Sequence, residues 1–195
     1  AALLSSPSSA LILSGVSDSL NVEATINGGQ FIGGSHLLIN GSSGAHAISS
    51  FSDVSLTIND GYFQGGNNPL GQAGGSALLI NGRADSGSVN VTNINGGVFR
   101  SGEPDAIPAG FSGDSAIVFG GAPLNIRGGD FDGIQALSST LNVYGTAFEL
   151  DGTPLTFARE VVLALEEEGA GVLKVDYLGG TFDDIVFRNS GSSTI

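Results

Sequence analysis

The stretch LNIRGGDFDGIQALSSTLNV, residues 124–143, holds the shortest repeat of the chain and decides the fold class. Three extended runs follow one another in it, LNI, GGDF and IQAL, and LN returns 17 residues later, from Leu124 to Leu141. Phe131 and Phe148 repeat this interval. Gly, Asn and Ser between the runs favour tight corners. The unit therefore predicts one coil of a parallel β-solenoid with three short strands, whose copies stack about 4.8 Å apart.

Two motifs recur at longer spacings, and both predict the same kind of coil. We interpret the longer spacings as coils with loops inserted at their corners, such as 67–75 and 101–110. With 32 Gly and 6 Pro in 195 residues, an α-helical repeat is excluded. The first motif occurs as ATINGGQF (24–31), LTINDGYF (56–63), NINGGVF (93–99) and LNIRGGDF (124–131). The second motif occurs as SALILSG (9–15), SHLLING (35–41), SALLING (76–82) and SAIVFGG (115–121).

The chain is expected to form one all-β domain with three zones. Residues 1–23 carry an incomplete N-terminal coil, 24–149 form the regular coils, and 150–195 form modified C-terminal coils and a tail. In the last zone we expect the strands 161–165, 172–177 and 185–187. A short helix over 158–168 is the alternative, because Glu and Ala favour helix there whereas two adjacent valines favour strand.

Stacked coils bring equivalent side chains into ladders. The phenylalanines are expected to stack inside the solenoid, and the asparagines before the glycines are expected to hydrogen-bond along its axis. Thr57 and Thr92 are expected at equivalent positions of the repeat, too few for an ice-binding surface. The predicted ladders are Phe31, Phe63, Phe99 and Phe131, and Asn27, Asn59 and Asn95. A second, outward-facing polar row is expected at Asn21, Asn90, Asn125 and Asn142, with Ser55.

Composition excludes several classes of function. The formal net charge is −13 with a single lysine, Lys174, so binding to nucleic acid or to an anionic membrane surface is not expected. No apolar run approaches the roughly 18 residues of a transmembrane span. The absence of cysteine excludes disulfides and thiolate chemistry. Because the chain contains no Met, we interpret Ala1 as a product of processing. We expect a secreted or cell-surface protein.

These strands and corners resemble the right-handed parallel β-helices of the pectate-lyase-like superfamily. The motifs LNVYG (141–145), INGGxF and SALLING are closest in style to secreted bacterial repeat proteins and autotransporter-passenger-like surface proteins. The resemblance covers about residues 9–187, and it implies the fold more strongly than any activity, because the matching positions are core and corner residues.

Acidic residues provide the candidates for chemistry. Asp130 and Asp132 flank Phe131 and are expected to point outward, where Ca²⁺ could bind between them, although no calcium-loop motif is present. His36 and His46 have no acidic partner in sequence. We therefore predict no catalytic residues and no obligatory cofactor. A polysaccharide lyase or hydrolase is the alternative, since enzymes on this fold use clustered carboxylates.

The two ends of a solenoid leave strand edges unpaired, and such edges recruit other chains. The expected assembly edges are Leu11, Ile12 and Leu13 at one end and Ile185, Val186 and Phe187 at the other. Contacts between unlike ends would propagate into filaments. The sequence thus predicts a structural, self-associating solenoid of a bacterial surface or extracellular matrix. A carbohydrate-binding or polysaccharide-cleaving module, or a passenger-type adhesin, is the alternative.

Overall fold

The computed structural model describes most of the chain up to residue 150 and parts of the remainder. From residue 147 onward, and at residues 118, 136 and 137, it describes the backbone alone. The described ranges are 8–15, 22–35, 44–51, 54–68, 74–81, 91–102, 117–120, 123–137, 140–145, 147–150, 153–155, 160–161, 170–176 and 182–190.

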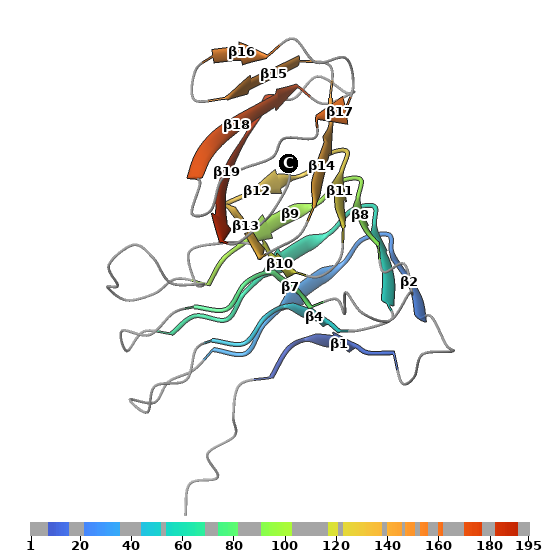
Figure 1. Cartoon of the computed structure of the whole chain (residues 1–195). Coiled ribbons are helices and arrows are strands. Elements are labelled where there is room, and N and C mark those ends of the chain that lie inside the picture. The colour runs from blue at the N-terminus through green and yellow to red at the C-terminus, as the bar shows by residue number, and fades with distance from the viewer. Residues whose placement is uncertain are drawn as a thin grey trace, which may run out of the picture.

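Every regular element of the described residues is a strand, and the strands form three sheets. Figure 1 shows them stacked from β1 at the bottom to β15 and β16 at the top. Sheet A contains, in spatial order, β1 (Leu11–Leu13), β4 (Ile48–Ser50), β7 (Leu78–Asn81), β10 (Ile117–Gly120), β13 (Ile134–Leu137), β19 (Phe182–Ser190), β18 (Ala170–Asp176), β15 (Ala147–Leu150) and β16 (Thr153–Leu155).

The other two sheets are shorter. Sheet B contains, in spatial order, β17 (Glu160–Val161), β14 (Leu141–Tyr144), β11 (Leu124–Ile126), β8 (Thr92–Ile94), β5 (Val54–Ile58) and β2 (Val22–Ile26). Sheet C contains β12 (Asp130–Phe131), β9 (Val98–Arg100), β6 (Tyr62–Gln64) and β3 (Gln30–Ile32). All pairings among the strands β1 to β14 are parallel, so successive repeats lie on one another in register. This arrangement is consistent with a β-solenoid.

The shortest repeat behaves as its sequence predicts. It gives one strand to each sheet, namely β11, β12 and β13, and Leu124 pairs with Leu141 in the next repeat. Apolar side chains alternate along each strand and point inward, so that Ile58, Ile94 and Ile126 form one fully buried column. Three strands per coil thus fit the spacing of the sequence.

The second motif is out of register at one copy. β1 pairs with Ile48–Ser50, which in turn pairs with β7, so the strand between them comes from HAISSF (46–51) rather than from SHLLING (35–41). Most of 35–41 lies outside the described residues. The prediction for that copy is wrong because local pattern alone does not determine which segment reaches sheet A.

A glycine-rich corner explains how insertions are accommodated. At this corner one segment follows the strand of sheet C and another precedes the strand of sheet A. Both segments must fit into the stack of coils. Gly66 donates its N–H to Ala45 O at 2.7 Å, and Gly75 donates to Gly66 O at 2.8 Å. A Cβ at Gly66 would lie 2.0 Å from Gly34 O, which is part of the backbone, so only glycine fits there. The insertions of consecutive coils therefore start from one corner.

The C-terminal zone departs from the predicted coils. β15, β16, β18 and β19 pair antiparallel, and β17 pairs antiparallel with β14. Of the predicted strands, 172–177 and 185–187 overlap β18 and β19, whereas most of 161–165 lies outside the described residues. Glu160 and Val161 are strand, and the rest of the alternative helix 158–168 also lies outside the described part. Phe148 belongs to β15 in sheet A and does not continue the phenylalanine spacing in sheet C.

The second expected assembly edge is also wrong. Ile185, Val186 and Phe187 lie in β19, which is an internal strand of sheet A between β13 and β18. Ile185 pairs with Leu173, and Phe187 pairs with both Ile134 and Gly171. The reason is that β18 and β19 form an antiparallel hairpin, so the strand that follows β13 in space comes from the end of the sequence. At this end of sheet A the outermost described strand is β16.

Candidate functional site

Four phenylalanine rings form one continuous stack inside the coils. The ring centroids of Phe31 and Phe63 are 5.2 Å apart, those of Phe63 and Phe99 4.8 Å, and those of Phe99 and Phe131 5.0 Å. Phe63 and Phe99 have no exposed surface, whereas Phe31, in the first coil, is only partly buried. The stack is therefore sealed in its middle and incompletely covered at its N-terminal end.

The predicted asparagine ladder is present on the outside of the corner between sheets B and C. Asn59 Nδ2 donates to Asn27 Oδ1, and Asn95 Nδ2 donates to Asn59 Oδ1, each at 2.7 Å. Arg127 occupies the next position, where its backbone N–H donates to Ile94 O at 2.8 Å. All four side chains are exposed. The ladder binds neighbouring coils to one another along the axis.

The second polar row has different members from those predicted. Asn125 donates to Asn93 Oδ1, and Asn142 donates to Asn125 Oδ1, each at 2.9 Å. Asn93 therefore takes the place expected for Asn90, which lies outside the described residues, as does Asn21. Ser55 pairs with Glu23, two residues before the row.

The pairing of Thr57 with Thr92 is also wrong. Thr57 pairs with Asn93, while Thr92 pairs with Leu56 and Leu124 and points into the core with 2% of its surface exposed. In the register of β5 and β8, Thr92 takes the inward position of Leu56, and Asn93 takes the outward position of Thr57. The two threonines therefore lie on opposite faces of sheet B.

Arg127 connects the polar row to an aromatic ring. Its guanidinium Nη1 donates to Asn93 Oδ1 at 3.3 Å, and its Cζ lies 4.3 Å from the ring centroid of Tyr144. A cation at this distance is attracted by the aromatic ring. Arg127 therefore lies over sheet B, whereas the basic residue that pairs with Asp130 is Arg100.

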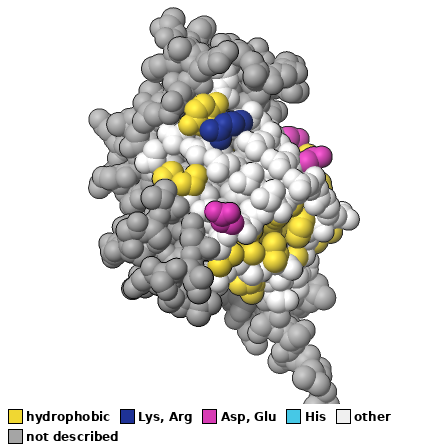
Figure 2. All heavy atoms as spheres, turned by 90° about the vertical axis from the view of Figure 1, so that its right-hand side faces the viewer, with side chains coloured by type: hydrophobic (Ala, Val, Ile, Leu, Met, Phe, Trp, Pro, Cys, Tyr) yellow, Lys and Arg dark blue, Asp and Glu magenta, His cyan; other side chains and the backbone are white. Residues whose placement is uncertain are grey.

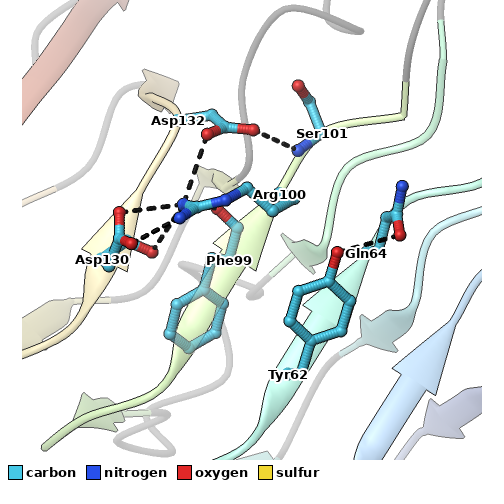
Figure 3. A network of polar contacts seen from close by, with 7 residues as sticks. All are labelled: Tyr62, Gln64, Phe99, Arg100, Ser101, Asp130 and Asp132. Carbon is cyan, nitrogen blue, oxygen red and sulfur yellow. Dashed lines mark hydrogen bonds and ion pairs between the residues drawn. The ribbon is translucent and has the colours of Figure 1, made fainter.

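An ion-pair network lies on the outer face of sheet C (Figure 3). Arg100 Nη1 donates to Asp130 Oδ1 at 2.9 Å and lies 3.3 Å from Asp132 Oδ1, and Nη2 also contacts Asp130 Oδ2. Asp132 Oδ2 accepts the backbone N–H of Ser101 at 3.2 Å. The hydrogen bond from Arg100 lowers the pKa of Asp130. Both carboxylates are thus held by a guanidinium, which leaves them poorly arranged for a cation.

The same face carries two further polar side chains in register with this network. Tyr62 Oη and Gln64 Oε1 are 3.0 Å apart, and Gln64 pairs with Arg100 in the next coil. Sequence reasoning missed Arg100. Aligning the repeats at phenylalanine would have found it, because Gln64, Arg100 and Asp132 each follow the ladder phenylalanine directly.

In the described part of the chain, no cluster of side chains suits metal binding, and the one described histidine, His46, has a structural role. No three His, Cys, Asp or Glu side chains gather there closely enough to hold a metal ion. His46 Nδ1 accepts the backbone N–H of Ser76 at 3.0 Å, and burial lowers the pKa of His46. The ring is therefore neutral at pH 7 and acts as a structural acceptor. His36 lies outside the described residues.

The N-terminal coil presents an open end. β1, β2 and β3 are the outermost described strands of sheets A, B and C. Leu11, Leu13, Val22, Ala24 and Phe31 pack against the core yet remain partly exposed. Figure 2 shows hydrophobic side chains gathered in the lower part of one face, at the height of β1 and β2 in Figure 1. The expected edge Leu11–Leu13 thus lies in the outermost described strand of sheet A.

Comparisons with protein-family models, with curated proteins and with solved structures found no match to this chain. None of its described segments is a helix with the length and apolar character needed to cross a lipid bilayer. The class that the structure defines is therefore an all-β protein with three stacked, largely parallel sheets.

Proposed function

We propose that this chain is a non-enzymatic structural solenoid, a right-handed parallel β-helix, that acts at a cell surface or in an extracellular matrix. In this proposal it associates with other copies through its first coil. The observation that carries the proposal is the difference between the ends. At the first coil three strand edges and several apolar side chains are uncovered in the described structure, whereas antiparallel strands follow the last coil.

The environment of the candidate acids supports a structural role. Asp130 and Asp132 both contact Arg100, so neither is positioned as an isolated general acid or base. The asparagine and phenylalanine ladders connect coil to coil and use their side chains for stability. The relationship to the pectate-lyase-like superfamily belongs to the same proposal and concerns the fold.

Sedimentation velocity over a wide range of concentrations tests self-association. We expect the wild-type chain to sediment as species larger than one chain, and more so at higher salt, because the net charge of −13 opposes contact. A monomer at every concentration and ionic strength would overturn the proposal. Immunogold labelling of the source cells tests the location, and label confined to the cytoplasm would contradict it.

A second candidate function is binding of a neutral polysaccharide on the outer face of sheet C. Tyr62, Gln64 and the Arg100 network offer an aromatic ring, an amide and charged hydrogen-bonding groups across consecutive coils. Such groups bind sugars by stacking and hydrogen bonding.

A glycan array tests this candidate. Binding that Tyr62→Ala weakens about tenfold, while Asn81→Ala on sheet A leaves it unchanged, would support a carbohydrate-binding module. The absence of binding to any glycan would exclude it. Release of reducing ends, abolished by Asp130→Asn and Asp132→Asn, would instead indicate a polysaccharide-cleaving enzyme.

A further inference from the structure

We propose that two copies of this chain join through their first coils about a two-fold axis, forming a closed pair rather than a filament. This inference rests on the proposed self-association and names its partner and geometry. It follows from the directions of backbone groups in β1, β2 and β3, from the exposed apolar side chains of that coil, and from the unlike ends of the molecule.

In β1 a single residue turns its backbone toward the open side. Leu11 donates its N–H to Ala47 O at 3.0 Å, and Leu13 O accepts the N–H of Phe51 at 2.9 Å, so both face β4. Backbone groups alternate in direction along a parallel strand. The N–H and C=O of Ile12 therefore point away from β4, to the side where no described strand lies. The side chain of Ile12 is 59% exposed.

In β2 and in β3, two residues each point their backbone N–H and C=O groups toward the open side. Ile26 O accepts the N–H of Asn59 at 2.8 Å, which turns Ile26 toward β5 and leaves Glu23 and Thr25 facing the open side. Gly29 O accepts the N–H of Tyr62 at 2.9 Å, which likewise leaves Gln30 and Ile32 facing the open side. The first coil thus presents one outward-facing residue in sheet A and a matched set of two in each of the other sheets.

A two-fold axis matches these groups with one another. An axis perpendicular to the stack, level with the middle of β1 and half a strand spacing beyond it, places sheet A edge to edge with sheet A of the second copy and brings sheet B of each copy to sheet C of the other. The rotation reverses strand direction, so each new pairing is antiparallel. Ile12 then faces Ile12 of the second copy as a hydrogen-bonded pair, in which each residue donates its N–H to the other's C=O. The two outward-facing residues of β2 face the two of β3 in the second copy.

The same contact covers the exposed end of the core. Phe31 is partly exposed, while Phe63, the next ring in the stack, is fully buried. Leu11, Leu13 and Val22 share this partial exposure. Joining two first coils would remove these side chains from water on both copies, and burial of apolar surface drives association.

The other end of the molecule argues against head-to-tail growth. A filament would need parallel edges in all three sheets at that end, but sheets A and B finish there with the antiparallel strands β16 and β17. Only 5% of the surface of Phe131, the last described ring of the stack, is exposed. A chain with one adhesive end can form only a closed pair, because an isologous contact uses the same patch on both partners.

Disulfide trapping tests the axis directly. The chain has no cysteine, so Ile12→Cys introduces a unique thiol. Hydrogen-bonded antiparallel residues have Cα atoms about 5.5 Å apart, within the range of a disulfide. On addition of diamide, which takes up the two thiol hydrogens, we expect a covalent dimer of Ile12→Cys. Asn81→Cys, which is also exposed and lies two strands further into sheet A, is the control and should remain monomeric in denaturing gels.

Sedimentation of wild type and Ile12→Lys completes the test. We expect wild type to reach a plateau at twice the mass of one chain, and Ile12→Lys to weaken association roughly tenfold or more, because two lysines would meet at the axis. An unchanged circular dichroism spectrum controls for folding, since Ile12 points outward. Growth without a plateau and no trapping of Ile12→Cys would overturn the two-fold pair but keep self-association. Monomers throughout would overturn both.

Discussion

The burial of each phenylalanine ring determines how much that ring contributes to the stability of the stack. Phe99 lies between two other rings and has no exposed surface, whereas Phe31 has a neighbour on one side only among the described rings. Truncating a fully buried phenylalanine removes its burial free energy and leaves a cavity. The position of a ring in the ladder should therefore decide its contribution.

We expect Phe99→Ala to lower the free energy of unfolding by about 3–5 kcal/mol and Phe31→Ala to lower it by clearly less. Urea denaturation in the Ile12→Lys background measures both without a contribution from self-association. Equal losses at the two positions would contradict the described burial.

The Arg100–Asp130 contact should make a small, pH-dependent contribution to stability. The pKa of Asp130 lies below its ordinary value of 3.8 in the folded protein, because Arg100 hydrogen-bonds the ionised carboxylate. Its contribution is therefore complete above that ordinary value and is lost as the pH falls through the lower folded pKa. Since 54% of the Asp130 side chain is exposed, the gain should be at most about 1 kcal/mol.

Arg100→Gln tests this contribution. Between about pH 5 and pH 7 the variant should unfold at a slightly lower urea concentration than wild type, and the difference should disappear near pH 2. Asp130→Asn should show the same pH trend with a smaller loss, because it leaves the contact between Arg100 and Asp132 in place. A difference that stays constant down to pH 2 would show that the ionised carboxylate does not produce it.

At the scale of elements, the sequence pattern identifies strands well where a repeat has no insertion. Leu124 to Leu141 gave the three strands of one coil because each apolar run reaches its own sheet with no loop between. The pattern failed at 35–41 because SHLLING looks like a strand of sheet A, whereas the pairing of β1 and β7 selects Ile48–Ser50. Apolar alternation does not reveal whether distant strands run parallel or antiparallel, so the hairpin of β18 and β19 was also missed.

The glycine-rich corner at Gly66 allows a specific prediction about replacing glycine. Gly66→Ala should lower the free energy of unfolding by more than about 3 kcal/mol or prevent folding, because its Cβ would meet the backbone of Gly34. Gly28 has φ +152° but no atom within 4 Å of an added Cβ, so Gly28→Ala should cost only about 1 kcal/mol. Thermal unfolding of both variants measures the contrast. Equal effects would contradict the close approach of the Gly34 backbone as the reason for glycine at position 66.

At the scale of the whole molecule, the two ends differ in kind. The sequence predicted an edge at Leu11–Leu13, and β1, β2 and β3 are the outermost described strands of their sheets. It misassigned the other end because strand direction in the C-terminal zone depends on pairings between segments far apart in the chain, such as β13 with β19. Because of this asymmetry we propose a closed pair, where the sequence predicts a filament.

Cryo-electron microscopy of the wild-type protein tests that conclusion most directly. We predict rods of two chains with a two-fold axis at their centre, where the first coils meet and the antiparallel strands β15 and β16 lie at both outer tips. Fibres of stacked chains, or two-chain particles joined through β15 and β16, would contradict it.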